Sequence, residues 1–173
     1  MTQAQFTELK TFSPRHKRYI INILTEIINH YGDLLLGYTI FGSYARGENN
    51  KNSDLDLLII LRKAASISKR LRDFVENIEI KHEPLAQEIF EQEDIFCELS
   101  PYILTGDEAL KIHPIYYDLV EHHLIIFDPE NLITHIITST DNILTKCNAQ
   151  KVRSNNSWEW QTVKLGFLGG IDL

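Results

Sequence analysis

The stretch that decides the fold is FGSYARGENNKNSDLDLLII, which spans residues 41–60. It begins with a turn at Gly42 and Ser43, continues through a polar loop, and ends with Asp54 and Asp56 at the start of an aliphatic segment. Side chains two residues apart on a strand point the same way, so the two carboxylates share one face. Because like charges repel, one of the two pKa values should rise unless a cation lies beside them. The pattern therefore predicts a cation site at the start of a buried strand.

Phosphate chemistry explains the turn that precedes these acids. Mg²⁺ prefers oxygen ligands and commonly takes one or two carboxylates together with substrate phosphates. A glycine directly after a strand permits unusual dihedral angles and a close approach, so backbone N–H groups and the Ser43 hydroxyl can contact a phosphate. Taken alone, Gly42-Ser43 is typical of an ordinary turn, and the acid pair is typical of a cap or a surface pair. In this order and spacing, they favour a joint phosphate and metal site.

Hydrophobic periodicity predicts helices and strands on both sides of this stretch. Ser13-Pro14 is typical of a helix start, and apolar residues then recur at three- and four-residue steps as far as Tyr31. We expect strands over residues 34–41, 54–61, 95–104 and 124–127, and helices over residues 64–80, 84–94 and from Asp128-Pro129 to about Cys147. Shorter features are helix starts at residues 45–47 and 105–108, a break at His113-Pro114, an edge or bulge at Pro101, and a strand or loop around Trp158.

These elements predict one α/β (α+β) domain with a mixed β-sheet flanked by helices. A chain of 173 residues suits a single domain, which we expect to span residues 1–173. We place its catalytic core at about residues 14–104 and a small C-terminal extension at about residues 105–173.

The charge distribution argues against some classes of partner. The net charge is −7, and residues 1–82 carry 12 Lys/Arg and 9 Asp/Glu, whereas residues 83–173 carry 5 and 15. Affinity for long nucleic acids comes mainly from basic patches, so we expect no such partner. The acidic C-terminal half is typical of a solvated surface or of a face for a basic protein partner.

Other features indicate a cytoplasmic protein. No apolar run approaches the roughly 20 residues that cross a membrane, and the N-terminus lacks the apolar region of a signal peptide. Cys97 and Cys147 are isolated, which fits a reducing compartment and small buried side chains. His122-His123 has no Cys or carboxylate at ligand spacing, so a structural or surface pair is the simpler interpretation.

The order Gly42-Ser43, ten intervening residues, then Asp54-Leu55-Asp56 resembles the signature of the DNA polymerase β-like nucleotidyltransferase superfamily. Gly47 and Ser53 also match its small single-domain members, the minimal nucleotidyltransferases, whose prokaryotic group includes antitoxins. The strong resemblance covers about residues 40–60, and a weaker one continues to the C-terminus. It implies the nucleotidyltransferase fold and an enzyme of the EC 2.7.7 type. Such an enzyme transfers a nucleoside monophosphate, most simply AMP from ATP, to a hydroxyl and releases pyrophosphate.

The resemblance also implies a role for each matching residue. Gly42 and Ser43 would hold the β- and γ-phosphates of the nucleotide. Asp54 and Asp56 would ligate Mg²⁺, with two ions expected. Arg46 would add positive charge at the triphosphate, although a solvated side chain is an equal alternative.

The family usually has a third acid on a neighbouring strand, which binds metal or takes the proton of the acceptor hydroxyl. Glu98 is the only acid within the apolar part of the third predicted strand, so it is the candidate. Family members more often have Asp there, and an edge-strand charge that faces solvent is the alternative.

The acceptor is open at this stage. A chain of this size lacks the extra domains that grip nucleic acid, so we expect a hydroxyl of a protein or small molecule. A HEPN-type toxin tyrosine is one candidate, because small family members are often antitoxins that adenylylate such toxins. The alternatives are an aminoglycoside-type small-molecule nucleotidyltransferase and a non-catalytic nucleotide-binding or interaction module on the same fold. A homo-oligomer is compatible with all of these.

Overall fold

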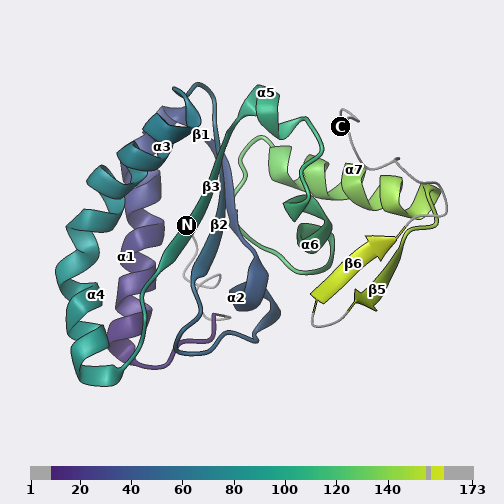
Figure 1. The fold of residues 1–173 in the computed structure, drawn as a ribbon. Coiled ribbons are helices and arrows are strands. Elements are labelled where there is room, and N and C mark those ends of the chain that lie inside the picture. Colours follow the sequence, from purple (N-terminus) through teal and green to yellow (C-terminus); the bar gives the residue numbers. More distant parts are fainter. Residues whose placement is uncertain (1–8, 155–156, 162–173) are drawn as a thin grey trace.

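The computed structural model describes residues 9–154 and 157–161, and a mixed sheet at its centre is flanked by helices (Figure 1). The strands of this sheet are β1 (Leu35–Ile40), β2 (Leu55–Leu61), β3 (Leu99–Thr105) and β4 (Leu124–Phe127). The α-helices are α1 (Pro14–Tyr31), α2 (Gly42–Arg46), α3 (Ile67–Phe74), α4 (Ile80–Glu93), α5 (Gly106–Ala109), α6 (Ile115–Glu121) and α7 (Leu132–Lys146). A 3₁₀ turn, η2 (Gly32–Leu34), follows α1, and a π-helical turn, η3 (Val75–Glu79), joins α3 to α4. Strands β5 (Gln150–Ser154) and β6 (Ser157–Gln161) form a separate hairpin.

The central sheet has the strand order β3-β2-β1-β4. Strand β1 is antiparallel to both β2 and β4, whereas β2 and β3 run parallel, so the predicted mixed sheet is confirmed. Strand β2 lies in the interior of the sheet, and its residues 57–60 are fully buried. Strand β4 comes from the expected C-terminal extension, so that part of the chain supplies one edge of the central sheet.

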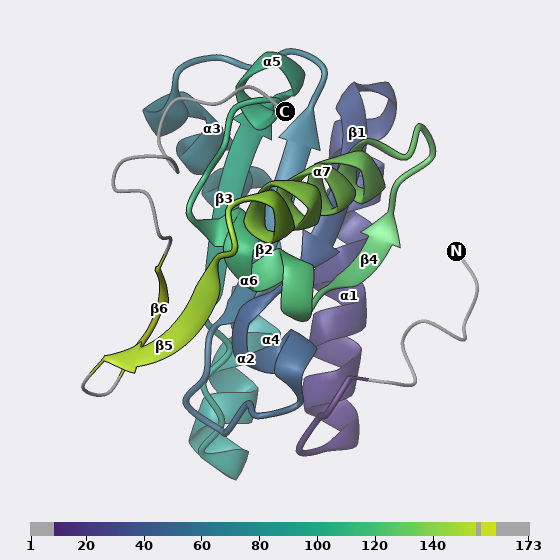
Figure 2. The same ribbon diagram turned by 90° about the vertical axis from the view of Figure 1, so that its right-hand side faces the viewer.

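Helices cover both faces of the sheet, as Figures 1 and 2 show. Leu57 and Ile59 pack in one core with residues of α1 and α4, while Leu58 and Ile60 pack in a second core with residues of α6 and α7. Because side chains alternate along a strand, Asp56 belongs to the face that carries Leu58. The start of β2 therefore presents its acid on the side of the sheet that α6 covers.

Several predicted boundaries agree with the structure. Helix α1 begins at Pro14, and the Ser13 hydroxyl caps it by accepting a hydrogen bond of 3.1 Å from the His16 N–H. Strands β1, β2 and β4 lie within one residue of their predicted ends. Strand β3 lies at the edge of the sheet, as Pro101 indicated, although it begins four residues later than expected.

The predicted break between two helices before Pro84 is wrong. Helix α3, the π-helical turn and α4 follow one another without interruption from Ile67 to Glu93. A proline inside a helix removes one backbone hydrogen bond. The buried side chains Phe74, Ile78 and Ile89 of this segment pack into the core, and this packing outweighs the loss.

The expected helix start at residues 45–47 is also wrong, because α2 begins at Gly42 and ends at Arg46. Helix α6 was not expected at all. It has only seven residues, too few for a clear periodic pattern, and its start carries no side-chain cap.

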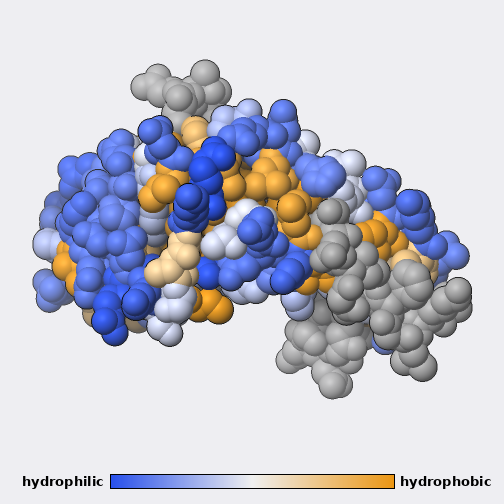
Figure 3. All heavy atoms as spheres, turned by 90° about the horizontal axis from the view of Figure 1, so that it is seen from above, coloured by the Kyte–Doolittle hydropathy of each residue, from blue (hydrophilic) through white to orange (hydrophobic). Residues whose placement is uncertain are grey.

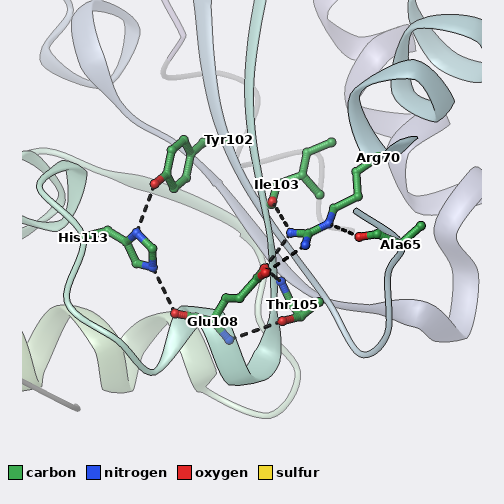
Figure 4. Close-up of polar contacts among 7 residues, drawn as sticks. All are labelled: Ala65, Arg70, Tyr102, Ile103, Thr105, Glu108 and His113. Atoms are coloured by element: carbon green, nitrogen blue, oxygen red, sulfur yellow. Dashed lines mark hydrogen bonds and ion pairs between the residues drawn. The ribbon is translucent and has the colours of Figure 1, made fainter. Parts of the chain in front are cut away.

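A buried arginine closes the free edge of β3 (Figure 4). Arg70 of α3 donates to the backbone oxygens of Ala65 and Ile103 and makes two hydrogen bonds, of 2.6 and 2.8 Å, with the Glu108 carboxylate. Glu108 also belongs to a capping box with Thr105 at the start of α5. The guanidinium thus joins α3, the edge strand and α5, and it occupies a backbone acceptor of that edge strand.

The surface is mainly hydrophilic in the view from above, with apolar patches between the charged side chains (Figure 3). None of the helices in the described part of the chain combines the length and apolar character that a membrane span requires.

Candidate active site

The turn between β1 and β2 brings Gly42 against the second acid of the pair. Gly42 has a φ of +65°, and a Cβ added to it would lie 2.0 Å from Oδ2 of Asp56. No residue with a side chain fits there without moving the carboxylate. The predicted need for glycine at this position therefore has two physical causes, the positive φ and the missing space.

Ser43 follows in the first turn of α2. Its Oγ is buried and has no hydrogen-bond partner within the described residues. A buried hydroxyl without a partner costs free energy, so such a group usually bonds a water, an ion or a ligand. Because Ser43 lies directly beside the Gly42–Asp56 contact, the group that satisfies it would lie next to the acids.

A hydrogen bond between His16 of α1 and Tyr44 of α2 fixes the position of α2. His16 Nδ1 accepts from the Phe12 N–H at 3.3 Å, so in the neutral ring the proton lies on Nε2, which donates to the Tyr44 hydroxyl at 3.2 Å. Burial lowers the pKa of His16, which favours this neutral form. Tyr44 is buried, and its contact with His16 of α1 therefore holds the helix that carries Gly42 and Ser43.

The two acids differ in environment. Asp54 is exposed, whereas Asp56 is half-buried. Burial and the adjacent Asp54 carboxylate raise the pKa of Asp56 to about 6, while a hydrogen bond from Ser100 and the positive charge of Arg46 act in the opposite direction. The repulsion expected from the sequence is therefore present.

Strands β2 and β3 run parallel, and their register places Ser100 level with Asp56. Ser100 is a residue that the sequence reasoning missed, although its spacing of two from Glu98 puts both positions on one face of a strand. Glu98 itself lies just before β3, and its backbone oxygen accepts a hydrogen bond of 2.9 Å from the Leu55 N–H. The backbone of Glu98 is thus level with the start of β2.

The side chain of Glu98 is exposed, and its charge acts on Glu79. Burial and the carboxylates of Glu83 and Glu98 raise the pKa of Glu79, which lies in the π-helical turn before α4. Within the described residues, no group of three or more His, Cys, Asp or Glu side chains has the geometry to hold a metal ion. The structure thus brings Asp54 and Asp56 together with Gly42, but it does not add the Glu98 carboxylate to them.

Two further charged side chains belong to the surroundings of Asp56. Arg46, at the end of α2, is paired with Glu48 at 2.9 Å. Asp118, in α6, contributes to the raised pKa of Asp56. The sequence offered no signal for Asp118, because its role depends on packing between elements 60 residues apart.

Comparisons with known proteins identify the family to which this fold belongs. The family model described as a nucleotidyltransferase domain matches residues 20–137. A relative from Methanocaldococcus jannaschii, named as a candidate protein adenylyltransferase, is 27% identical over 150 residues, which cover 83% of this chain and 95% of the relative.

One of the solved structures that resemble this chain has a TM-score above 0.5 and shows the same fold. A spectinomycin adenyltransferase from Enterococcus faecialis, solved with ATP and spectinomycin, has a TM-score of 0.51 at 14% identity, and the match covers 66% of this chain and 57% of that one. A complex of a tri-AMPylated HEPN toxin with an MNT antitoxin from Shewanella oneidensis has a TM-score of 0.36 at 12% identity, covering 75% and 92% of the two chains. The family model matches more than half of the length of this chain. The chain therefore belongs to the nucleotidyltransferase domain family and is an enzyme that transfers a nucleotidyl group from a nucleoside triphosphate.

Proposed function

We propose that the protein transfers AMP from ATP to a hydroxyl group of another protein and releases pyrophosphate, in a reaction that requires Mg²⁺. The observation that carries the proposal is the contact of Gly42 with Asp56, beside the unpartnered Ser43 hydroxyl. The sequence relative that is named as a candidate protein adenylyltransferase supports the choice of AMP and of a protein acceptor.

The donor half of the reaction falls to the turn and α2. The Ser43 hydroxyl would donate to a phosphate oxygen, and backbone N–H groups beside Gly42 would contact the same anion. Arg46 would exchange its exposed partner Glu48 for the triphosphate, since surface ion pairs of this kind contribute little to stability.

The residues present fit Mg²⁺. Asp54 and Asp56 supply two carboxylates on one face, and burial together with the Asp54 charge raises the pKa of Asp56, so a cation beside the pair would favour its ionised form. When bound, Mg²⁺ would neutralise the charge that develops on the phosphates. The chain's own part is to hold the two carboxylates close together at the start of β2, while the Ser100 hydrogen bond favours the ionised form of Asp56.

The acceptor half requires a base. The hydroxyl oxygen forms a bond to the α-phosphorus, the bond to the bridging oxygen of the β-phosphate breaks, and pyrophosphate leaves with that electron pair. The hydroxyl proton passes to a base, for which we propose Glu98 as the third acid. The register supports this role, because the Glu98 backbone is level with the start of β2, and the exposed side chain is free to turn toward the acids.

Transfer of label from α-labelled ATP in the presence of Mg²⁺ tests the proposal. The acceptors are a cell lysate and a purified HEPN-type toxin, whose tyrosine is the acceptor that the resemblance to antitoxin-like members suggests. We expect the wild type to label a protein band. In Asp54→Asn and Asp56→Asn, we expect the rate of label transfer to fall by at least about 100-fold. Asp141→Asn, an exposed acid on α7, is the matched control. Equal labelling by all four proteins would refute the proposal.

A second candidate is a nucleotide-binding module that does not catalyse transfer. The separation of the Glu98 side chain from the other two acids favours it. In that case, ATP binds but no pyrophosphate is released with any acceptor. Glu98→Gln decides whether Glu98 takes part, since an unchanged transfer rate removes it from the mechanism.

A further inference from the structure

A cavity of about 510 Å³ lies where three separate parts of the chain meet, and its lining includes Arg46 and Asp118, whose charges act on Asp56. Arg46 and Glu48 line it from the end of α2 and the loop that follows. Asp118, Glu121 and His122 line it from α6, and Lys151 lines it from β5. In both ribbon views, α6 lies near α2 and the β5–β6 hairpin lies to one side of α6 (Figures 1 and 2). The C-terminal part of the chain therefore supplies one wall of a space next to the site.

Most of the charges around this cavity are already compensated. Arg46 is paired with Glu48, and Lys151 is paired with Glu121. The carboxylate of Asp118 makes no hydrogen bond or ion pair with any residue that the structure describes. Among the described lining residues, the Arg, Lys, Asp and Glu charges sum to −1, and Asp118 is the uncompensated carboxylate.

This charge decides which part of the reaction uses the cavity. Apart from Arg46, which the triphosphate would use, the described lining offers an anion one cation, Lys151, against three carboxylates, so the rest of the cavity is not suited to the phosphates. A purine base needs apolar or aromatic surface to stack on, and the described lining offers only the imidazole of His122 and the guanidinium of Arg46. The acceptor is the remaining reactant. Asp118 and Arg46 both lie close enough to Asp56 to affect its pKa.

We propose that this cavity receives the acceptor and that Asp118 selects acceptors that carry a positive charge near the reacting hydroxyl. This inference rests on the proposed function, because it names the chemical class of the acceptor for the same site. A cationic group would pair with the free Asp118 carboxylate without displacing Lys151 from Glu121. The strongly acidic second half of the chain, with 5 Lys/Arg and 15 Asp/Glu over residues 83–173, would favour the approach of such an acceptor.

Two sources share this chemistry, namely a hydroxyl-bearing side chain flanked by basic residues and an amino-substituted ring alcohol. Two pairs of probes distinguish them. The first pair is a tyrosine peptide flanked by arginines and the same peptide flanked by serines. The second pair is the diamine 2-deoxystreptamine and the neutral alcohol inositol. Binding is measured by calorimetric titration of the full chain with Mg²⁺ and a non-hydrolysable ATP analogue present, so the readout does not depend on turnover.

For at least one pair, we expect the wild type to bind the cationic probe about tenfold more tightly than the neutral one. Asp118→Asn should reduce that preference by about fivefold, since it removes the charge and keeps the shape. Its affinity for the ATP analogue should not change. Asp141→Asn, which makes the same substitution on an exposed face of α7, should keep the full preference.

The outcomes separate this inference from the proposed function. The pair that shows the preference identifies the source of the acceptor. Equal binding of cationic and neutral probes in both pairs, or a preference that survives Asp118→Asn, would overturn the inference even where AMP transfer takes place. Absence of AMP transfer from labelled ATP would refute the proposed function, and the binding preference would still test the role of Asp118.

Discussion

Replacement of Gly42 by alanine tests the central contact of the site. The new Cβ would lie 2.0 Å from Oδ2 of Asp56, and Cβ atoms essentially never come closer than 3.0 Å to another heavy atom. The carboxylate must therefore move by about 1 Å, and a displacement of this size in a catalytic group costs on the order of 100-fold in rate. The positive φ of +65° adds about 1–2 kcal/mol of backbone strain. We expect Gly42→Ala to lose about 100-fold in transfer of label from α-labelled ATP.

Gly47→Ala is the matched control for this substitution. Gly47 has a φ of +70°, close to that of Gly42, but a Cβ added to it meets no atom within 4 Å. Both variants should lose about 1–2 kcal/mol in the free energy of unfolding, measured with urea. Only Gly42→Ala should also lose the transfer activity. If both variants kept the wild-type rate, or lost it equally, the contact between Gly42 and Asp56 would not position the acid.

Three further substitutions test separate parts of the structure. Ser43→Ala should leave the free energy of unfolding within about 0.5 kcal/mol of wild type and weaken ATP binding about tenfold in a titration, because its hydroxyl has no partner in the described part of the chain. Glu108→Gln should cost about 2 kcal/mol in urea unfolding, less than a fully buried pair because the Glu108 side chain is 37% exposed. Hydrogen bonds from Arg70 lower the pKa of Glu108 to about 2, so this stability is present above its ordinary value of 4.5 and is lost as the pH falls from there toward 2. This pH dependence would be contradicted if, between pH 4.5 and 2, the melting temperature of the wild type fell no faster than that of Glu108→Gln. Asp56→Asn should stabilise the metal-free protein at pH 7 by about 2 kcal/mol, because the wild type loses stability as the pH rises from 3.8 to about 6 and the acid ionises. Added Mg²⁺ should raise the melting temperature of the wild type and not that of this variant.

The donor half of the site could be predicted from the sequence because its signals are local. Gly42, Ser43, Asp54 and Asp56 lie within 15 consecutive residues, and the alternation of a strand is enough to put the acids on one face. The buried strands and α1 were predicted for the same reason, since their apolar residues recur with a fixed period.

The rest of the site depends on packing between distant segments. Asp118 and Lys151 reach the cavity only because α6 and the hairpin fold back toward α2, and no local pattern encodes that approach. The side chain of Glu98 lies outside the regular strand, so alternation did not determine its direction. Residues 162–173, which contain the last part of the weaker resemblance, lie outside the described residues.

Two buried charges in this protein differ in a way that favours a functional interpretation of the acid pair over a structural one. Arg70 is only 7% exposed, and its guanidinium is bonded to a carboxylate and two backbone oxygens. Folding alone explains such a group, because every part of its charge has a partner. Asp56 is half-buried against another carboxylate, beside a hydroxyl with no partner and a glycine with a positive φ. Each of these three features lowers the stability of the fold, and a phosphate together with a divalent cation would relieve the first two at once. We therefore expect the free energy that the fold gives up at this site to favour the binding of a nucleotide together with Mg²⁺.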